Sequence, residues 1–267
     1  MRLDRFLAEQ TGLSRKQVRE EIKKGRVTVN SVVTKEAEFK VEPEGDEVSL
    51  GGRRIGYRAF HYYMLNKPAG VISSTKREQG SPFAEDETEQ SGEEETGART
   101  VLELLPKELR RGLSPVGRLD KDTEGLLLLT DDGALLHRLI SPKHHVRKVY
   151  EVHLKKEITD EELERLKKGV DIGDEKPTLP AEYVRREADE EGRPVIELTI
   201  YEGRYHQVKR MLAAVNNKVI YLKRLAIGEV VLDPALKPGE FREVVLDPAI
   251  KPGEFREVIK EELAISK

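Results

Sequence analysis

The sequence predicts an α+β protein made of a small N-terminal module and a larger second module, and three observations support this. Apolar residues recur at helical spacing in the first 22 residues and then alternate as in a strand. The four leucines at 126–129 form a run that is too short to span a membrane and suits a buried strand. A length of 267 residues is enough for one medium domain and one small domain.

Composition and charge exclude several classes of protein and leave nucleic acid as a possible partner. The chain has no cysteine, which excludes a disulfide framework and a thiolate metal site. No apolar run is long enough for a membrane span, and the N-terminus does not resemble a signal peptide, so we expect a cytoplasmic protein without a membrane partner. The net charge is −3, but residues 78–95 contain eight acids and no base, and without those acids it would be +5. The overall sign is therefore compatible with a nucleic-acid partner.

The first module, residues 1–50, begins with two predicted helices. Leu3, Phe6 and Leu7 form one apolar stripe, and Ser14 with Gln17 forms a capping box that starts the second helix. Val27 and Val29 then alternate with polar residues as in a strand, and Asn30-Ser31 indicates a turn. The first 26 residues carry a net charge of +4, and the basic side chains considered as RNA contacts are Arg2, Arg15, Lys16, Arg19, Lys23 and Arg26. Composition alone leaves them equally consistent with a solvated helix face.

Residues 51–60 are rich in glycine and arginine and are predicted to be a linker. The second module is expected to cover residues 61–242. It opens with a predicted strand that ends in a turn set by Pro68 and Gly70, where Lys67 is either a phosphate contact or a solvated lysine. Residues 78–98 are acidic and almost without apolar side chains, which predicts a disordered surface insertion.

The central stretch, residues 117–133, places Arg118 and Asp120 in a loop directly before the leucine strand. Asp122 is interpreted there as a turn residue. The stretch closes on Asp-Asp-Gly, a turn signal, and a short helix is expected over 134–140. His144 and His145 follow, but sequence neighbours rarely converge on one ion, so we predict no metal site.

Tyr150 lies on a predicted strand over 149–154 and by burial statistics is an ordinary core tyrosine. A capping box of Thr159 and Glu162 predicts a helix over 160–168, and a strand over 196–200 follows. Beyond it, an apolar stripe predicts a helix over 208–215 that displays its bases, among them Lys209, on another face.

Residues 229–242 recur at 243–256 with one difference, at positions 236 and 250. Two copies are too few for a solenoid, so we interpret the second copy as a tandem duplication. The extra copy, which lies in the tail over 243–267, is therefore expected to be redundant or to pack on a sheet edge.

Two sets of motifs resemble known families. The string Gly-Arg-Leu-Asp followed by Thr-x-Gly-Leu-Leu-Leu-Leu-Thr resembles the catalytic motif of pseudouridine synthases that modify ribosomal RNA. Residues 63–70, the Lys-x-Tyr at Tyr150 and residues 202–211 are similar to three further motifs of that family. The N-terminal strings Arg-Leu-Asp-x-Phe-Leu, Ser-Arg-x-x-Val and Gly-Arg-Val-x-Val-Asn are similar to the S4 RNA-binding domain. The resemblance implies an S4-like domain followed by a synthase domain whose mixed, mainly antiparallel sheet is flanked by helices.

The resemblance also implies site residues. Asp120 would be the nucleophile, Lys209 would pair with it and favour its ionised form, and Tyr150 would stack on the uracil and relay a proton. Arg118 would fill the space that the flipped base leaves, whereas Arg204, Arg210 and Lys67 would be substrate-binding candidates for RNA phosphate. The reaction involves no redox change, so neither a cofactor nor a metal is expected.

The implied partner is ribosomal RNA, 16S RNA within an assembly intermediate, modified by a monomer. Residues 141–145 and 202–211 favour the small-subunit branch, and 23S RNA is the alternative. Two other classes compete: a non-catalytic RNA-binding or ribosome assembly protein, and a metal-independent hydrolase built on Asp120. The Asp–Tyr–Lys set argues against the first, and the lack of a paired carboxylate or histidine argues against the second.

Overall fold

The computed structural model describes residues 1–76 and 98–244. The fold is α+β, as predicted, and it divides into two compact units. The first comprises residues 1–61 and 105–112, and the second comprises residues 62–104 and the chain from 113 onward. The predicted acidic insertion, apart from Ala98, lies outside the described residues, so its predicted disorder stays a prediction.

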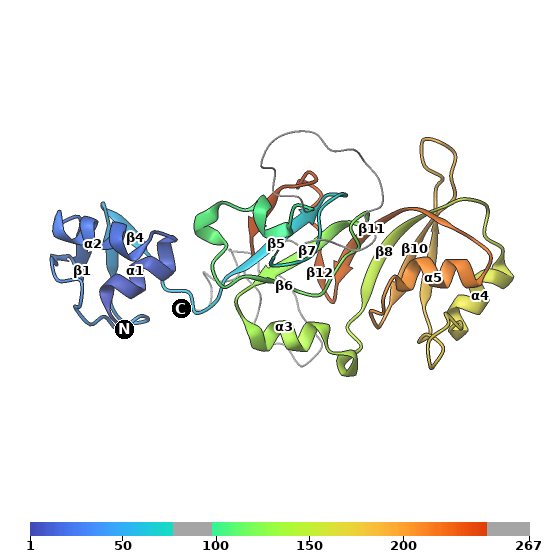
Figure 1. The fold of residues 1–267 in the computed structure, drawn as a ribbon, viewed down its shortest axis with the longest axis horizontal. Helices are drawn as coiled ribbons and strands as arrows, with labels where there is room; N and C mark the ends of the chain where they lie inside the picture. The colour runs from blue at the N-terminus through green and yellow to red at the C-terminus, as the bar shows by residue number, and fades with distance from the viewer. Residues whose placement is uncertain (77–97, 245–267) are drawn as a thin grey trace, which may run out of the picture. The chain divides into compact units, whose positions relative to one another are not determined.

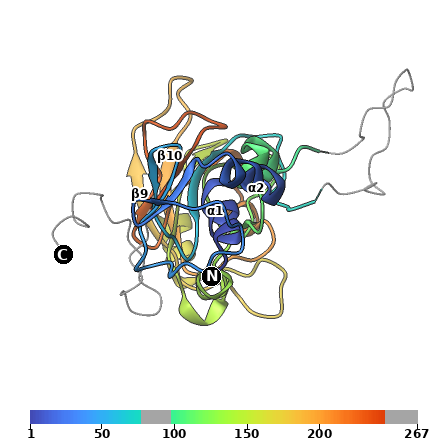
Figure 2. The same cartoon turned by 90° about the vertical axis from the view of Figure 1, so that its left-hand side faces the viewer.

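The first unit packs two helices, which lie side by side, on a small antiparallel sheet (Figure 2). The sheet has the strand order β2-β1-β3-β4, and the capping box of Ser14 and Gln17 is present as predicted. Leu3, Phe6 and Ile22 are buried in its core. The elements are α1 (Leu3–Thr11), α2 (Arg15–Lys23), β1 (Val27–Val29), β2 (Val32–Val33), β3 (Val48–Leu50), β4 (Arg53–Ile55) and the 3-10 helix η2 (Lys107–Leu109).

The prediction of a linker over 51–60 was wrong. Gly51 and Gly52 form the turn of a hairpin, and β4 pairs with β3 at the edge of the sheet. Beyond β4, the ring of Tyr57 stacks on Phe6 with 6.2 Å between centroids. The glycines form a tight turn and the arginines lie on an exposed edge strand. A flexible linker has a similar composition, so composition did not distinguish the two.

The second unit is built on one mixed sheet of nine strands, with the main order β13-β5-β7-β11-β8-β10-β9 (Figure 1). Strand β12 pairs with β11, and β6 pairs with β7. The strands are β5 (Tyr62–Lys67), β6 (Ser114–Pro115), β7 (Glu124–Thr130), β8 (Lys148–Leu154), β9 (Glu182–Arg186), β10 (Val195–Ile200), β11 (Val219–Ile227), β12 (Val230–Val231) and β13 (Phe241–Glu243). The helices are α3 (Gly133–Ile140), α4 (Asp160–Lys168), α5 (Gln207–Ala214) and two 3-10 helices, η1 (Val101–Leu104) and η3 (Pro142–His144).

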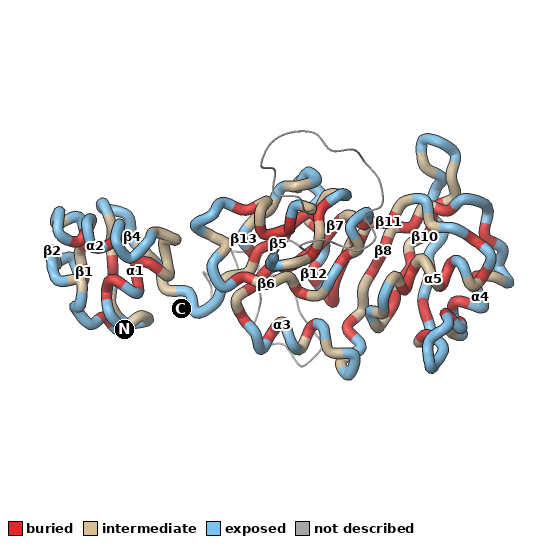
Figure 3. The backbone as a smooth tube through the Cα atoms, in the orientation of Figure 1, coloured by how far each residue is buried: buried red, intermediate tan, exposed pale blue. Residues whose placement is uncertain are grey.

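The leucine run forms β7, as predicted, and each of its four leucines is at most 2% exposed. The burial is continuous along β5 and β7 after the first residue of each strand, whereas buried and half-buried residues alternate along most of β8 (Figure 3). At the end of β7, the carboxylate of Asp132 accepts hydrogen bonds from the backbone N–H groups of Ala134 and Leu135 and caps α3. A buried strand with a capped exit gives the loop before it a rigid base.

Strands β7 and β11 form the parallel pair of this sheet, and they meet in register at two positions, Lys223 with Glu124 and Arg224 with Gly125. The two strands approach so closely that a Cβ on Gly125 would lie 2.3 Å from the carbonyl oxygen of Arg224. Gly125 also has φ +99°, which disfavours any side chain. We call this junction the seam; it joins the half-sheet β13-β5-β7 to the half-sheet β11-β8-β10-β9.

The first repeat copy is part of the sheet. Val230 on β12 is fully buried, and β13 pairs with the edge of β5. The pairing continues into the start of the second copy, where the N–H of Val244 donates to the carbonyl of Tyr62. The second unit therefore extends past the predicted boundary at 242, and the rest of the second copy lies outside the described residues.

Candidate active site

Asp120 lies on a short loop that leads into β7. Its neighbour Leu119 is buried, and both backbone groups of Leu119 bond to the hydroxyl of Ser73: the N–H donates at 3.0 Å and the carbonyl accepts at 2.9 Å. The chain then turns, and the N–H of Thr123 donates to the carbonyl of Asp120. The loop backbone is thus fixed, while the carboxylate of Asp120 stays about one quarter exposed.

Lys67 lies beneath this loop and is fully buried. Its ammonium donates to the carbonyls of Pro68, Lys121 and Thr123 at 3.0, 3.2 and 2.8 Å. Burial lowers the pKa of Lys67 to about 8. Neither interpretation made from the sequence was right, because Lys67 is neither a solvated lysine nor accessible to a phosphate. It ties β5 to the loop that carries Asp120.

Lys209 comes from the first turn of α5, on the other side of the seam, and its Nζ lies 3.1 Å from Oδ2 of Asp120. It also lies 2.6 Å from Oδ1 of Asp122, and Nε2 of His206 lies 3.5 Å from Oδ1 of Asp120. Burial alone would lower the pKa of Lys209, but its hydrogen bonds to the two carboxylates raise it above the usual value. The structure brings together the acid and the base that the sequence paired.

Asp122, interpreted as a turn residue, shares that lysine with Asp120. Partial burial would raise the pKa of Asp122, and the hydrogen bond from Lys209 lowers it below its usual value. The spacing Asp-x-Asp was the available signal, since two acids in one loop can face one base. His206 was also missed as a neighbour of Asp120, although it stands inside the string 202–211.

Tyr150 is buried on β8 and lies opposite Arg224 of β11, which in turn lies opposite Gly125 of β7. Directly opposed residues project to the same face of a sheet, so Tyr150 and Arg224 share a face. Among the described residues, no hydrogen bond joins Tyr150 to Asp120 or Lys209. The tyrosine is thus placed in the cross-strand row that ends at Gly125, near the base of the loop that carries Asp120.

Arg224 is a buried cation that the sequence analysis did not select. Its Nε donates to the carbonyl of Leu126 at 2.8 Å, whereas its buried Nη2 has no hydrogen-bond partner within the part of the chain that the structure describes. The sequence around it did not indicate this burial, because arginine is rarely buried and an arginine on a strand is expected to face solvent.

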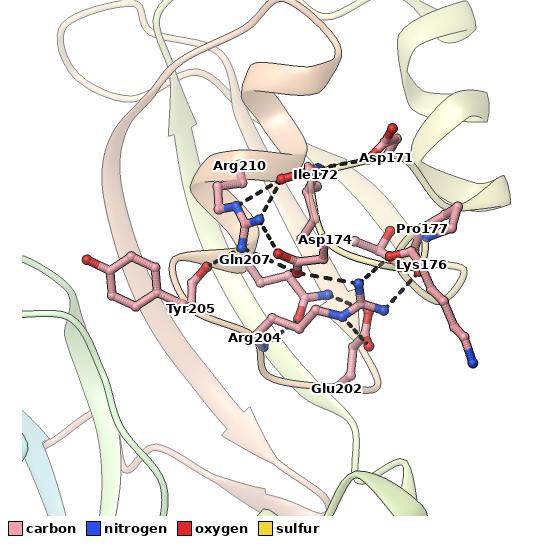
Figure 4. Close-up of polar contacts among 12 residues, drawn as sticks. Asp171, Ile172, Asp174, Lys176, Pro177, Glu202, Arg204, Tyr205, Gln207 and Arg210 are labelled. Carbon is pink, nitrogen blue, oxygen red and sulfur yellow. Dashed lines mark hydrogen bonds and ion pairs between the residues drawn. The ribbon is translucent and has the colours of Figure 1, made fainter.

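Arg204 and Arg210, expected to contact RNA phosphate, are engaged within the protein (Figure 4). The guanidinium of Arg204 donates to the carbonyls of Lys176 and Pro177 and to the carboxylate of Glu202. That of Arg210 is paired with Asp174 and also donates to the carbonyls of Ile172 and Tyr205. Both side chains hold loops in place, and their expected contact with RNA phosphate stays a prediction. Arg118 is exposed, and no hydrogen bond or ion pair of its side chain occurs among residues 1–76 and 98–244.

The six basic candidates of the first unit fall into two groups. Arg2 and Arg19 both bond to the buried carboxylate of Asp4, and Arg26 pairs with Glu21. Burial would raise the pKa of Asp4, but the two arginines hold it below the usual value. The other three are exposed and have no ion-pair partner in the described part of the chain: Arg15, Lys16 and Lys23.

A surface hollow of about 680 Å³ lies elsewhere, around Glu151, His153 and Asp189. Glu151 and His153 alternate with Tyr150 along β8, so the hollow opens on the opposite face of the sheet. Both ring nitrogens of His153 are hydrogen bonded, at 2.7 Å to Asp189 and 2.8 Å to Glu151. Its polar groups satisfy one another, and we assign it no role.

Two further findings concern metal-binding groups and membrane-spanning helices. Within the described ranges, no three His, Cys, Asp or Glu side chains are grouped so that they could hold a metal ion. No helix in the same ranges has both the length and the apolar composition needed to cross a membrane.

The chain is similar to known proteins in both of its units. The family model for RNA pseudouridylate synthases matches residues 61–214, and the S4 domain model matches residues 1–48. A Bacillus subtilis (strain 168) protein described as an uncharacterized RNA pseudouridine synthase is 48% identical over 91% of this chain and 94% of its own length. The ribosomal small subunit pseudouridine synthase A of Escherichia coli (strain K12) is 41% identical over 91% and 95% of the two chains. A crystal structure of a pseudouridylate synthase is 36% identical, covers 92% of this chain and 96% of its own, and has a TM-score of 0.57.

Proposed function

Because this chain belongs to the RNA pseudouridylate synthase family and begins with an S4 domain, we propose that it isomerises a uridine of 16S ribosomal RNA to pseudouridine. The family supplies the activity on RNA, and the proposal concerns the target. The small-subunit name of the Escherichia coli relative supports 16S RNA. We further propose that the substrate is an assembly intermediate in the cytoplasm, where the enzyme acts as a monomer.

The observation that carries the mechanism is the distance of 3.1 Å between Nζ of Lys209 and Oδ2 of Asp120. Pseudouridine formation breaks the bond from C1′ to N1, turns the uracil and joins C1′ to C5. A proton leaves C5, and N1 gains a proton, so atoms balance without an oxidant. Asp120 supplies the anionic oxygen that assists cleavage at the sugar, and Lys209 offsets the charge of its carboxylate and orients it.

Tyr150 has the role of receiving the detached base. Its ring lies on the face shared with Arg224, in the row that leads across the seam to Gly125. An aromatic ring in an apolar strand can stack on uracil while the base turns, and its hydroxyl can relay the proton from C5. Among the basic residues beside the nucleophile, the exposed Arg118 suits the space that the flipped uridine leaves.

The first unit would position the enzyme on structured RNA. Arg15, Lys16 and Lys23 are the three basic candidates without an acidic partner in the described residues, and all are exposed. Reversing their charge should weaken binding of 16S RNA and make its dependence on salt concentration less steep, by about 1 in the log–log slope per lost phosphate contact. The matched control is Lys168→Glu, which removes an exposed base from α4 in the other unit. An equal loss in the control would assign the effect to net charge.

The target is tested by mapping pseudouridines in 16S and 23S RNA from cells with and without the protein. We expect one site to disappear from 16S RNA and to return when the wild-type chain is supplied. Loss of a site from 23S RNA instead would overturn the proposed target.

The roles of the two loop acids are separated by paired variants. Asp120→Asn keeps the size of the side chain but removes the charge, and should abolish turnover while RNA binding stays within a few-fold. Asp122→Asn removes the other carboxylate on Lys209 and, since Asp122 is 73% exposed, should keep most of the activity. Substantial turnover by Asp120→Asn would reject the mechanism.

A further inference from the structure

Tyr205 is 73% exposed, the highest value among the large hydrophobic side chains of the described residues. Singly exposed apolar side chains are common on proteins and need no explanation. Tyr205 differs because its ring is already ordered: it stacks on the ring of His206, with 3.8 Å between centroids and an angle of 18° between planes. Since His206 lies 3.5 Å from Asp120, the stacked pair leads from the nucleophile to solvent.

Stacking between two consecutive residues requires an unusual backbone. Successive side chains point to opposite faces of a strand and about 100° apart on a helix, so they do not normally overlap. His206 has φ +48°, in the left-handed region, directly before α5. A non-glycine residue held there by its surroundings is often part of a functional site.

The surroundings of the pair hold the backbone in that conformation. The carbonyl of Tyr205 accepts a hydrogen bond from Arg210, and the N–H of Arg204 donates to the side chain of Gln207. The guanidinium of Arg204 in turn joins this loop to the carbonyls of Lys176 and Pro177. Figure 4 shows these contacts on one side of the loop, with the ring of Tyr205 projecting away from them. The loop is rigid where it meets the protein and presents a flat apolar ring where it does not.

We propose that Tyr205 is a stacking platform for an unpaired nucleobase that flanks the target uridine. The inference rests on the proposed function, because it takes the site at Asp120 to receive a flipped uridine. When the target leaves the stack, its neighbour loses a stacking partner, and the ring of Tyr205 replaces it. Every base has a π-face, so the platform contributes affinity with little preference for the flanking base. Arg118 and Tyr205 then serve different places, the vacated space and the flanking base.

The absence of tryptophan from the sequence allows a direct test. Tyr205→Trp in the full chain introduces one tryptophan at the platform, and Asp120→Asn in the same protein prevents turnover during titration. Addition of 16S RNA, or of a short single-stranded oligouridine, should quench its fluorescence by base stacking. The control is Tyr183→Trp in the same background, on β9, where the ring lies under Lys167 and away from the site. Quenching equal to the control would overturn the proposal.

Steady-state kinetics with two substitutions give an independent readout. Tyr205→Phe keeps the ring and should match the wild type. Tyr205→Leu keeps apolar bulk but removes the π-face, and should raise KM about tenfold with little change in kcat, because the platform binds the flanking base in ground state and transition state alike. Equal KM values for the leucine and phenylalanine variants would reject the stacking role. Substitution of an exposed side chain changes the free energy of unfolding little, and thermal melting of both variants checks this.

The two proposals fail separately. If the wild type modifies 23S rather than 16S RNA, the target is wrong, while quenching at position 205 still tests the platform with oligouridine. If the wild type modifies 16S RNA and the Tyr205 variants behave like it, the platform is wrong and the proposed function stands.

Discussion

Gly125→Ala perturbs the seam without touching a charged residue of the site. The added Cβ would lie 2.3 Å from the carbonyl oxygen and 2.7 Å from the amide nitrogen of Arg224. Both are backbone atoms of β11, so no change of rotamer relieves the contact. A left-handed backbone costs an alanine about 1–2 kcal/mol, and overpacking costs about 1–3 kcal/mol. We therefore expect a loss of about 2–5 kcal/mol in the free energy of unfolding.

Thermal unfolding followed by circular dichroism measures this loss. For a unit of this size, each kcal/mol lowers Tm by about 2–4 °C, so the variant should melt about 4–20 °C below the wild type. The matched control is Gly133→Ala, since a Cβ at Gly133 meets no atom within 4 Å and the residue opens α3 without a positive φ. The control should melt at or slightly above the wild-type temperature.

Activity measured well below both melting temperatures gives the second readout. Lys209 and Asp120 approach from opposite sides of the seam, so widening it should lower kcat beyond what partial unfolding explains. A Gly125→Ala protein that melts within ~2 °C of the control and keeps full activity would refute the close approach of the two strands.

Three further outcomes are expected. Tyr150→Phe should retain RNA binding and lose turnover if the hydroxyl carries the proton, and equal activity would reduce Tyr150 to a packing residue. Burial lowers the pKa of Lys67 to about 8, against 10.5 for an ordinary lysine. Between pH 8 and pH 10.5 this side chain is therefore protonated to a greater extent in the unfolded chain than in the folded one. Stability should consequently rise over that window by up to ~3 kcal/mol, and chemical denaturation of Lys67→Met should show a smaller rise. Deletion of residues 243–256 leaves Phe-Arg followed by Glu-Val, the same strand sequence, and should change neither melting nor activity; destabilisation would show that the second copy packs on the protein.

Local signals in the sequence predicted much of the fold. The capping boxes at Ser14 and Thr159 and the buried leucine strand depend on neighbours within a few residues, and all three are present in the structure. The pairing of Lys209 with Asp120 spans 89 positions and came from resemblance to a family, not from periodicity.

Long-range partners account for what the sequence did not predict. A lysine beside Pro68 gives no sign that three carbonyls surround it, two of them more than fifty residues away. The contacts of Arg204 and Arg210 were missed for the same reason: these acceptors lie in a loop 27 to 38 residues earlier in the chain. The sequence shows that a side chain is basic, but the fold determines which acceptor it contacts.

The seam gives the molecule a mechanical property. Two register pairs connect the half-sheet that ends at β7 to the half-sheet that carries α5, the smallest number along the main strand order, so backbone pairing opposes bending least along this line. Asp120 and Lys209 lie on opposite sides of the seam, so opening the seam would lengthen the distance of 3.1 Å between Oδ2 and Nζ. An increase of about 1 Å would make that distance too long for a hydrogen bond. Turnover therefore depends also on residues such as Gly125, which carry no reactive group but keep β7 and β11 close together.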